Sequence, residues 1–406
     1  MTKSDSLLAR FDRFGQSIEK SIIELRRQLH QYPEIGHQEI KTTARLKKEL
    51  AGLKLKIHDG HAPTGLWAEL ETGKKGPVIA VRTDIDALPI TEMSGLPFAS
   101  KYPGFCHACG HDVHMSVLIG TARILTKFKD ELCGTVKFLC QPAEEVPPGG
   151  AKELIAAGVL KNPAVDAILA LHVDPDIPVG HIGMRDGVTM AATFDFDIII
   201  KGRTGHAALP HRAIDAITIA AHVVSGMQHI VSRRIDPIDA VAISFGKISG
   251  GTVRNGIAES VHIEGTARSL SPTMTKKLPG LIKKAAVNIA SGLGGKCEFK
   301  PMGMYPLFVS DARVNAHIAE TYRELYPKGR VHIVEKVLGG EDFACYLEKV
   351  PGAMFRLGVR NSKIGADKPW HNTAFKVDES AIRVGYTTMA STVARMLAKW
   401  KGGGKK

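Results

Sequence analysis

Apolar positions near the start of the chain recur at helical spacing, and short apolar runs follow them. The apolar residues of 18–29 fall on one helical face, and this pattern ends near Pro33. A second helix is expected over residues 39–50. Four near-continuous apolar runs then appear, each bounded by turn residues: 65–70, 78–81, 135–140 and 167–171. Such runs are typical of strands that are buried on both faces.

Helical segments are expected between some of these runs, at 113–125 and 151–157. The alternation predicts an α/β domain whose mostly parallel sheet is covered by helices. The same style returns after residue 305, in the segments 311–325, 331–337 and 353–357.

The pattern changes near Thr193, where apolar and polar residues alternate as in a half-exposed strand. Strands are expected at 194–200, 240–248, 260–267 and 296–300, with helices at 213–230 and 274–289. A four-stranded sheet with two helices is a self-sufficient α+β unit. We therefore expect a catalytic domain formed by 1–189 and 305–406, interrupted by an inserted α+β domain at 190–304.

Composition and charge exclude several classes of protein. The 406 residues carry a formal net charge of +13, but the lysines and arginines are scattered, apart from the tail from Lys399 to Lys406. A nucleic-acid-binding protein usually has a focused basic patch, so no nucleic-acid partner is expected. No apolar run has the length of a signal peptide or a membrane span, which predicts a cytoplasmic protein without a membrane partner.

The densest group of chemically active side chains lies between His107 and His114. It offers a thiolate, imidazoles and a carboxylate, and such ligands suit zinc and neighbouring transition metals. A buried structural cysteine with surface histidines is the alternative. The pair Cys106 and Cys109 could also be a redox motif or half of a zinc ribbon, but the second CxxC of a ribbon is missing.

Further candidates follow the predicted strands. Glu144 and Glu145 come just after the run 135–140, and His172 follows 167–171. Loops at the carboxyl ends of strands are where α/β proteins place their active sites. His371 adds another imidazole, whereas Asp84 and Asp86 are candidate ligands, supports for a metal-bound histidine, or turn residues.

These segments together resemble the M20 family of metallopeptidases and amidohydrolases. The resemblance is strongest to its branch of hippurate hydrolases, N-acyl-amino-acid amidohydrolases and indole-acetyl-amino-acid hydrolases. The motifs that carry it are Cys-Gly-His-Asp-x-His at 109–114, Gln-Pro-Ala-Glu-Glu at 141–145, Gly-His-Ala-Ala-x-Pro-His at 205–211 and Gly-Gly-Glu-Asp-Phe-Ala at 339–344. The matching segments run from 26–34 to His371 and so span nearly the whole chain.

The resemblance implies a set of metal ligands for two divalent ions, either Mn, Zn, Co or Ni: Cys109, His111, Glu145, His172 and His371. If the Cys109 thiolate binds both ions, each ion receives three protein ligands, which is the pattern of a catalytic site. By the same resemblance, Glu144 is the general base and Asp86 a support behind the ligands.

The inserted domain is, by the same resemblance, a lid that forms a homodimer or a dimer-based oligomer. His206 is then expected to reach the active site of the neighbouring subunit. The resemblance also places Asn255 near the substrate carboxylate. Arg268 is a candidate partner for that carboxylate because a guanidinium fork fits it, and a surface arginine is the alternative. The sequence departs from the family pattern at two places: Ala258 stands where the family commonly has proline, and the loop 360–368 has no match. Both departures bear on which substrate is chosen and not on the chemistry.

The predicted activity is hydrolysis of the amide bond of an N-acyl amino acid, such as an N-acetyl or N-benzoyl amino acid. A dipeptidase or carboxypeptidase of the same family is the first alternative. A non-catalytic metal-dependent binding protein is the second, and Glu144 argues against it, because a binding protein needs no second carboxylate beside the ligand Glu145.

Overall fold

The computed structural model describes residues 6–400, so the basic tail beyond Trp400 lies outside the described residues. The chain divides into two compact units. Unit 1 comprises Met1–Gly187, Val309–Glu335 and Cys345–Lys406, and unit 2 comprises Val188–Phe308 and Lys336–Ala344. Unit 2 thus also contains a segment outside the 190–304 range that we expected for the inserted domain.

An eight-stranded sheet forms the centre of unit 1. Its order is β1 (Lys56–Asp59), β2 (Leu66–Glu71), β4 (Thr135–Gln141), β3 (Val78–Asp84), β5 (Ala167–Pro178), β16 (Gly352–Arg360), β6 (Ile182–Met184) and β15 (Val331–Ile333). The four central strands β4, β3, β5 and β16 pair in parallel, whereas β1 and β2 join one side antiparallel. The α/β class expected from the apolar runs is confirmed.

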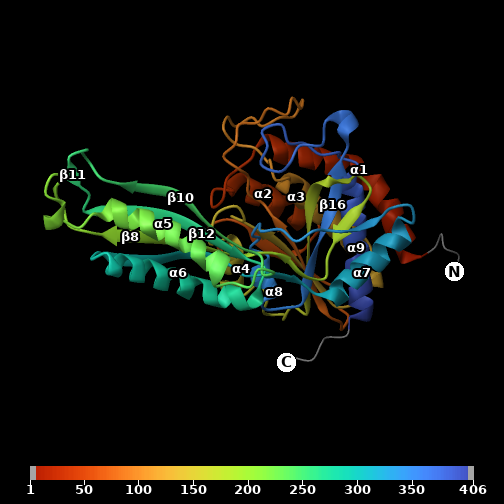
Figure 1. Ribbon diagram of the computed structural model, residues 1–406. Helices are drawn as coiled ribbons and strands as arrows, with labels where there is room; N and C mark the ends of the chain where they lie inside the picture. The colour runs from red at the N-terminus through yellow and green to blue at the C-terminus, as the bar shows by residue number, and fades with distance from the viewer. Residues whose placement is uncertain (1–5, 401–406) are drawn as a thin grey trace. The chain divides into compact units, whose positions relative to one another are not determined.

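The helices of unit 1 pack around this sheet (Figure 1). They are α1 (Leu7–Gln31), α2 (Ile40–Gly52), α3 (His111–Lys127), α4 (Gly150–Ala156), α7 (Ala312–Leu325) and α9 (Ala381–Lys399), with the short α8 (Ala344–Leu347) and the 3-10 turns η2 (Lys129–Glu131) and η4 (Ser362–Ile364). Helix α3 contacts α1, α9, β3 and β5, and it is buried almost all round. No described helix is long and apolar enough to cross a membrane.

Two details of unit 1 differ from the sequence-based expectation. Strand β5 continues to Pro178, because it stays paired with β16 as far as Arg360, so His172 lies inside the strand rather than at its end. Helix α9 was not anticipated. Several of its polar residues are fully buried, among them Thr387, Ser391 and Thr392. The alternation of apolar and polar residues that marks a half-exposed helix is therefore weak in this segment.

Unit 2 is an antiparallel sheet with two helices on one face (Figure 1). The sheet order is β10 (Val241–Gly250), β12 (Ser260–Ser269), β8 (Ala192–Lys201) and β13 (Lys296–Tyr305), and the helices are α5 (Ala216–Arg233) and α6 (Pro272–Gly292). Asp215 caps α5 and Ser271 caps α6 through their side chains. Apolar residues from the sheet and both helices form a separate core, for example Phe196, Ile263 and Ile282.

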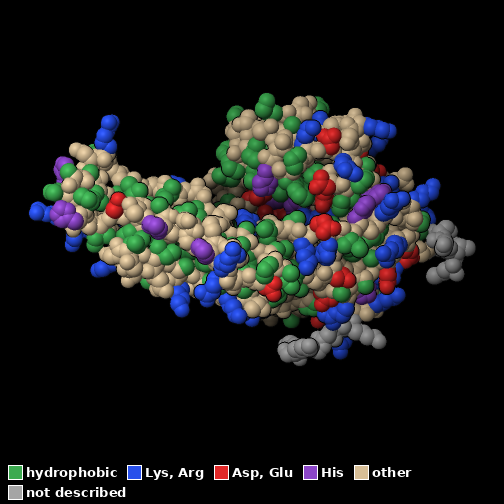
Figure 2. Space-filling view, in the orientation of Figure 1, with side chains coloured by type: hydrophobic (Ala, Val, Ile, Leu, Met, Phe, Trp, Pro, Cys, Tyr) green, Lys and Arg blue, Asp and Glu red, His purple; other side chains and the backbone are tan. Residues whose placement is uncertain are grey.

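Short elements complete unit 2. Strands β9 (Gly205–His206) and β11 (Gly256–Ile257) form a two-stranded ribbon, and η3 (Pro210–Arg212) follows β9. Strands β7 (Gly187–Met190) and β14 (Phe308–Ser310) lie where the chain passes from one unit to the other. On the face that Figure 2 shows, lysine and arginine side chains are spread over the surface and do not gather in one patch.

Candidate metal centre

The parallel pairing of the central strands brings the candidate ligands of unit 1 to one edge of the sheet. β3 ends at Asp84, β4 ends at Gln141 just before the glutamate pair, and β5 carries His172. Helix α3 begins at His111 and contacts both β3 and β5. Because parallel strands present their carboxyl ends at the same edge, residues far apart in the sequence meet there.

Gly110 makes the turn that separates Cys109 from His111. Its φ angle of 84° places it in the left-handed region, and it is the N-cap residue of α3. A Cβ atom at this position would lie 2.5 Å from the Cγ2 atom of Val173. Only glycine fits both the backbone conformation and the close approach, so this turn can hold Cys109 against strand β5.

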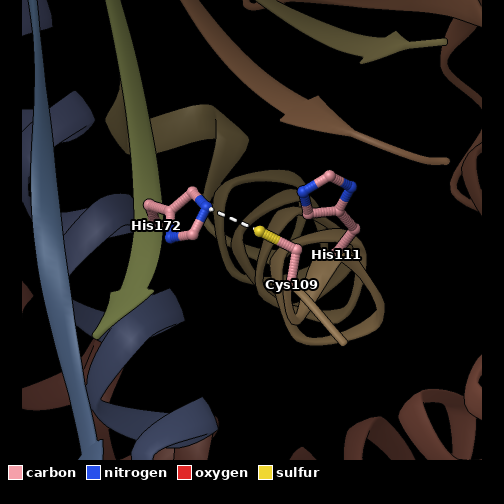
Figure 3. Close-up of side chains that lie close together, drawn as sticks. All are labelled: Cys109, His111 and His172. Atoms are coloured by element: carbon pink, nitrogen blue, oxygen red, sulfur yellow. Dashed lines mark hydrogen bonds between the residues drawn. The ribbon is translucent and has the colours of Figure 1, made fainter. Parts of the chain in front are cut away.

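Cys109 and His172 face each other directly. The Sγ atom of Cys109 lies 3.4 Å from Nε2 of His172, and His111 projects from the start of α3 beside them (Figure 3). One ligand atom from each of these three residues lies within 4.8 Å of the others, and all three residues are buried. A second such group consists of Cys109, Glu145 and His371, so Cys109 belongs to both.

Glu145 and His371 complete the cluster from two loops. Oε1 of Glu145 lies 3.2 Å from Nε2 of His371 and 4.0 Å from Nε2 of His111. The backbone N–H of His371 donates to the carbonyl of Ala108 at 2.9 Å, which ties this loop to the Cys109 turn. The structure thus brings all five predicted ligands together within unit 1.

The donor set fits a bound cation. Nε2 of His111 is buried, yet it makes no hydrogen bond among residues 6–400. It lies 3.8 Å from Oδ2 of Asp84 and 4.0 Å from Oε1 of Glu145, too far for a hydrogen bond to either. A buried imidazole nitrogen without a partner is costly in a folded protein, and a metal ion at this position would satisfy it.

Two carboxylates accompany the cluster. Oδ1 of Asp86 lies 3.2 Å from Nδ1 of His111, and Oδ2 accepts a hydrogen bond from the backbone N–H of Glu145 at 2.9 Å. Asp86 therefore contacts two of the candidate ligands at once. Glu144 is also buried, and one of its oxygens lies within 4.8 Å of ligand atoms of His111 and Glu145.

The pKa values of two imidazoles in the cluster, His111 and His371, are raised, whereas burial holds the pKa of His172 well below its usual value. Burial opposes protonation of His111, but Asp84 and the hydrogen bond to Asp86 outweigh it and hold its pKa well above the usual value. Contacts with Cys109 and Glu145 raise the pKa of His371 to about 10. In the metal-free chain, protons thus occupy atoms at which a metal cation would bind, so metal binding would release them.

The three candidates of unit 2 do not lie together. His206 and Asn255 are neighbours at the β9–β11 ribbon, where the backbone N–H of Ala207 donates to the carbonyl of Asn255 at 3.0 Å. Arg268 lies towards the other end of β12, and its Nη1 donates to the carbonyl of Leu338 at 2.9 Å. Ser260 and Arg268 are eight residues apart, or about 26 Å along an extended strand.

Sequence reasoning assigned no role to two side chains beside the cluster. His114 lies one turn after His111 on α3, with its Nδ1 atom 2.6 Å from Oδ1 of Asp84. Trp370 precedes His371, and its indole N–H donates to the carbonyl of Val173 at 3.0 Å. The sequence signals were the place of His114 at the end of the 109–114 motif and the adjacency of Trp370 to His371; the roles stayed hidden because the partners of both side chains come from distant segments.

A family model described as Peptidase family M20/M25/M40 matches residues 80–395, which is most of the chain. The chain belongs to this family. It is 41% identical over 365 residues to a Bacillus subtilis protein named N-acetylcysteine deacetylase, covering 89% of this chain and 93% of the relative. It is 36% identical over 373 residues to thermostable carboxypeptidase 1 of Saccharolobus solfataricus, covering 91% and 94%.

Among solved structures, a Bacillus subtilis protein described as a dinuclear metal binding peptidase from the M20 family matches with a TM-score of 0.81. It is 36% identical, and the match covers 94% of this chain and 99% of that chain. The M20 chain described here is therefore an amidohydrolase that uses divalent metal, and the side-chain cluster of unit 1 is the candidate site for it.

Proposed function

We propose that this enzyme hydrolyses the amide bond of N-acyl amino acids, such as N-acetyl or N-benzoyl amino acids, and releases a carboxylic acid and an amino acid. The observation that carries the proposal is the convergence of five metal-ligand side chains with Glu144 as a further buried carboxylate beside them. The resemblance to an N-acetylcysteine deacetylase supports the acyl amino acid as the substrate class.

We further propose two metal ions per subunit. Cys109, His111 and His172 form one group of ligand atoms, and Cys109, Glu145 and His371 form another. Because Cys109 belongs to both groups, each ion would be held by three protein side chains, which is the number that catalytic sites use. Thiolate and imidazole donors suit Zn, Co or Ni, and the carboxylate also suits Mn.

The protein residues then have distinct tasks in the reaction. When bound, the metals would supply Lewis acidity towards the acyl carbonyl. Glu144 takes a proton from the attacking water and returns it to the leaving amine, which is general acid–base catalysis. Asp86 fixes the ring of His111 and the backbone of Glu145, because it contacts both.

The positions within unit 2 favour a dimeric enzyme with shared active sites. Arg268 and the His206–Asn255 ribbon are separated by about 26 Å or more along β12, so one small substrate cannot contact both in the same copy. We propose that unit 2 is a lid and that the chain forms a homodimer or a dimer-based oligomer. His206 of one subunit would stabilise the oxyanion at the site of the other subunit, where Asn255 of the first subunit and Arg268 of the second would bind the substrate carboxylate.

Two other functions use the same chemistry or the same site. A dipeptidase or carboxypeptidase is supported by the similarity to a thermostable carboxypeptidase, although the identity is lower, at 36%. A non-catalytic metal-dependent binding protein would have no use for Glu144. A cytoplasmic location without nucleic-acid or membrane partners stays a prediction from the sequence.

A substrate panel tests the proposal. The metal-loaded enzyme would be assayed with N-acetyl and N-benzoyl amino acids, with dipeptides carrying a free amino group, and with N-blocked dipeptides. We expect the highest kcat/KM for a simple N-acyl amino acid. A preference of tenfold or more for either kind of dipeptide, about 1.4 kcal/mol in transition-state binding, would instead make the enzyme a peptidase.

A further inference from the structure

The backbone N–H and carbonyl of Val173 both make hydrogen bonds to side chains beside the metal centre. Its carbonyl lies 2.7 Å from Nδ1 of the preceding residue, His172, and 3.0 Å from Nε1 of Trp370. A carbonyl oxygen only accepts, so Nδ1 of His172 carries a proton and donates it. The lone pair of His172 is therefore on Nε2, the atom that faces Cys109 in Figure 3.

His114 holds the other side of the same strand residue. The backbone N–H of Val173 donates to Nε2 of His114 at 2.9 Å. Because Nε2 accepts this bond, the ring proton lies on Nδ1, which donates to Oδ1 of Asp84 at 2.6 Å. Arg82 fixes the remaining oxygen of Asp84 through a contact of 2.7 Å from Nη1 to Oδ2. The chain of contacts is buried throughout.

Both ring nitrogens of His114 are thus occupied by protein partners. A ligand atom of His114 does lie within 4.8 Å of ligand atoms of Asp84 and His111, which by itself could indicate a third ligand group. A metal at either nitrogen of His114 would have to displace a backbone N–H or a buried carboxylate. The hydrogen bonds therefore favour a role other than direct coordination.

We propose that His114 is a positioning residue that acts on the metal centre through Val173. It holds the backbone N–H of Val173, the residue whose carbonyl fixes the tautomer and the direction of the His172 ring. The same carbonyl holds Trp370, which precedes the ligand His371 and touches the His172 ring edge-on at 5.7 Å between centroids. The His114 imidazole thus orients two ligands, His172 and His371, which come from separate segments of the chain.

A pair of amide substitutions separates the two hydrogen bonds of His114. In His114→Asn the side-chain amide reaches the position of Nδ1 and can still donate to Asp84, but it cannot reach Val173. In His114→Gln the longer side chain brings an oxygen to the position of Nε2, where it can still accept from Val173. Positioning through Val173 therefore predicts that the glutamine variant keeps the function and the asparagine variant loses it.

The readout is a cobalt titration of the metal-stripped full-length protein, followed by visible absorption. Cobalt spectra report the number and geometry of the ligands, which a loss of fold stability alone does not change. We expect His114→Asn to weaken the binding of at least one cobalt ion by about 10- to 100-fold and to alter its spectrum. We expect His114→Gln to stay close to the wild type in both respects.

A variant on the same helix controls for damage to the fold. Ser116 is buried on α3 and donates to the carbonyl of Asp112 at 2.7 Å, a hydrogen bond that does not involve Val173. Ser116→Ala should lower the stability of the metal-free protein and leave cobalt affinity and spectrum unchanged. Trp370→Phe, which keeps an aromatic ring but loses the N–H, should alter the cobalt spectrum in the same direction as His114→Asn.

Three results would overturn the inference. Wild-type affinity and spectrum in His114→Asn would show that the contact with Val173 does not matter. Equal loss of one cobalt ion in the asparagine and glutamine variants would make His114 a ligand. A loss of cobalt affinity in Ser116→Ala that matches the loss in His114→Asn would show that lower stability of the fold explains the effect of His114→Asn. The inference rests on the proposed metal ligands. If the proposed metal site itself were wrong, the wild-type protein would bind no cobalt, and this result differs from all three above.

Discussion

Replacing Glu145 and Glu144 separately by glutamine should separate metal binding from catalysis. Oε1 of Glu145 lies 3.2 Å from Nε2 of His371 and 4.0 Å from Nε2 of His111, inside the cluster of predicted ligands. Glutamine keeps the shape of the side chain but removes its charge. We therefore expect Glu145→Gln to lose metal affinity, and Glu144→Gln to keep the metal and lose turnover.

The expected size of the metal effect follows from mass action. At a free metal concentration of 100 times Kd, one site stabilises the folded state by about 2.7 kcal/mol. Loss of a residue that only hydrogen-bonds to a metal ligand can weaken metal binding by up to about 100-fold. Loss of a ligand itself should weaken metal binding by at least that factor. The metal contribution then falls to about 0.4 kcal/mol, so Glu145→Gln should lose about 2.3 kcal/mol of metal-dependent stabilisation.

The expected effect of Glu144→Gln lies in the rate. A general acid–base residue contributes roughly 10²- to 10⁴-fold, so kcat should fall by that factor while the metal content stays unchanged. Denaturant unfolding with and without metal, metal content after desalting, and kcat measured on both variants decide the matter. Loss of metal from Glu144→Gln with retention in Glu145→Gln would show that the two roles are reversed.

Three further predictions concern the lid and the buried core. His206→Ala and Glu144→Gln should each be nearly inactive, but mixing with subunit exchange should restore activity in proportion to the heterodimer, and none should return if His206 acts within its own subunit. Arg26→Met should cost about 3–5 kcal/mol in urea unfolding, because Nε of Arg26 lies 2.7 Å from Oδ2 of Asp112 and both are buried; a cost below about 1 kcal/mol would contradict the ion pair. Burial acts to raise the pKa of Asp112, but Arg26 and the imidazole of His30 outweigh burial and lower that pKa. The ionised carboxylate therefore stabilises the folded state above about pH 4, and this stabilisation is lost on acidification. Acid unfolding of metal-free Asp112→Asn should therefore depend less on pH below that value than unfolding of the wild type.

The central strands were predictable because burial on both faces leaves a direct mark on the sequence. The apolar runs behind β2, β3 and β4 are continuous, and the structure buries nearly every residue of these strands. The carboxyl ends of β3 and β4 then indicated that Asp84, Asp86 and the glutamate pair belong to one site. The α5 and α6 helices of unit 2 were predictable for a related reason, since each has one apolar face against its sheet.

Other features depend on tertiary contacts that leave no local pattern. Helix α9 buries threonine and serine side chains among apolar neighbours, so periodicity could not reveal it. The strand containing His172 runs on to Pro178 because β16 pairs with it, although the apolar run that predicted the strand ends at Leu171. The tautomer of His172 depends on contacts from α3 and from the loop before His371, which only the folded chain brings together.

Removal and return of metal test the central claim most directly. The enzyme would be stripped with a chelator, desalted, and assayed with an N-acyl amino acid before and after addition of Mn, Co, Ni or Zn. The account predicts that hydrolysis disappears with the metal and returns with at least one of these ions, at a stoichiometry of two per subunit. Full activity in the metal-free protein, or no hydrolysis of any N-acyl amino acid by the metal-loaded protein, would contradict it.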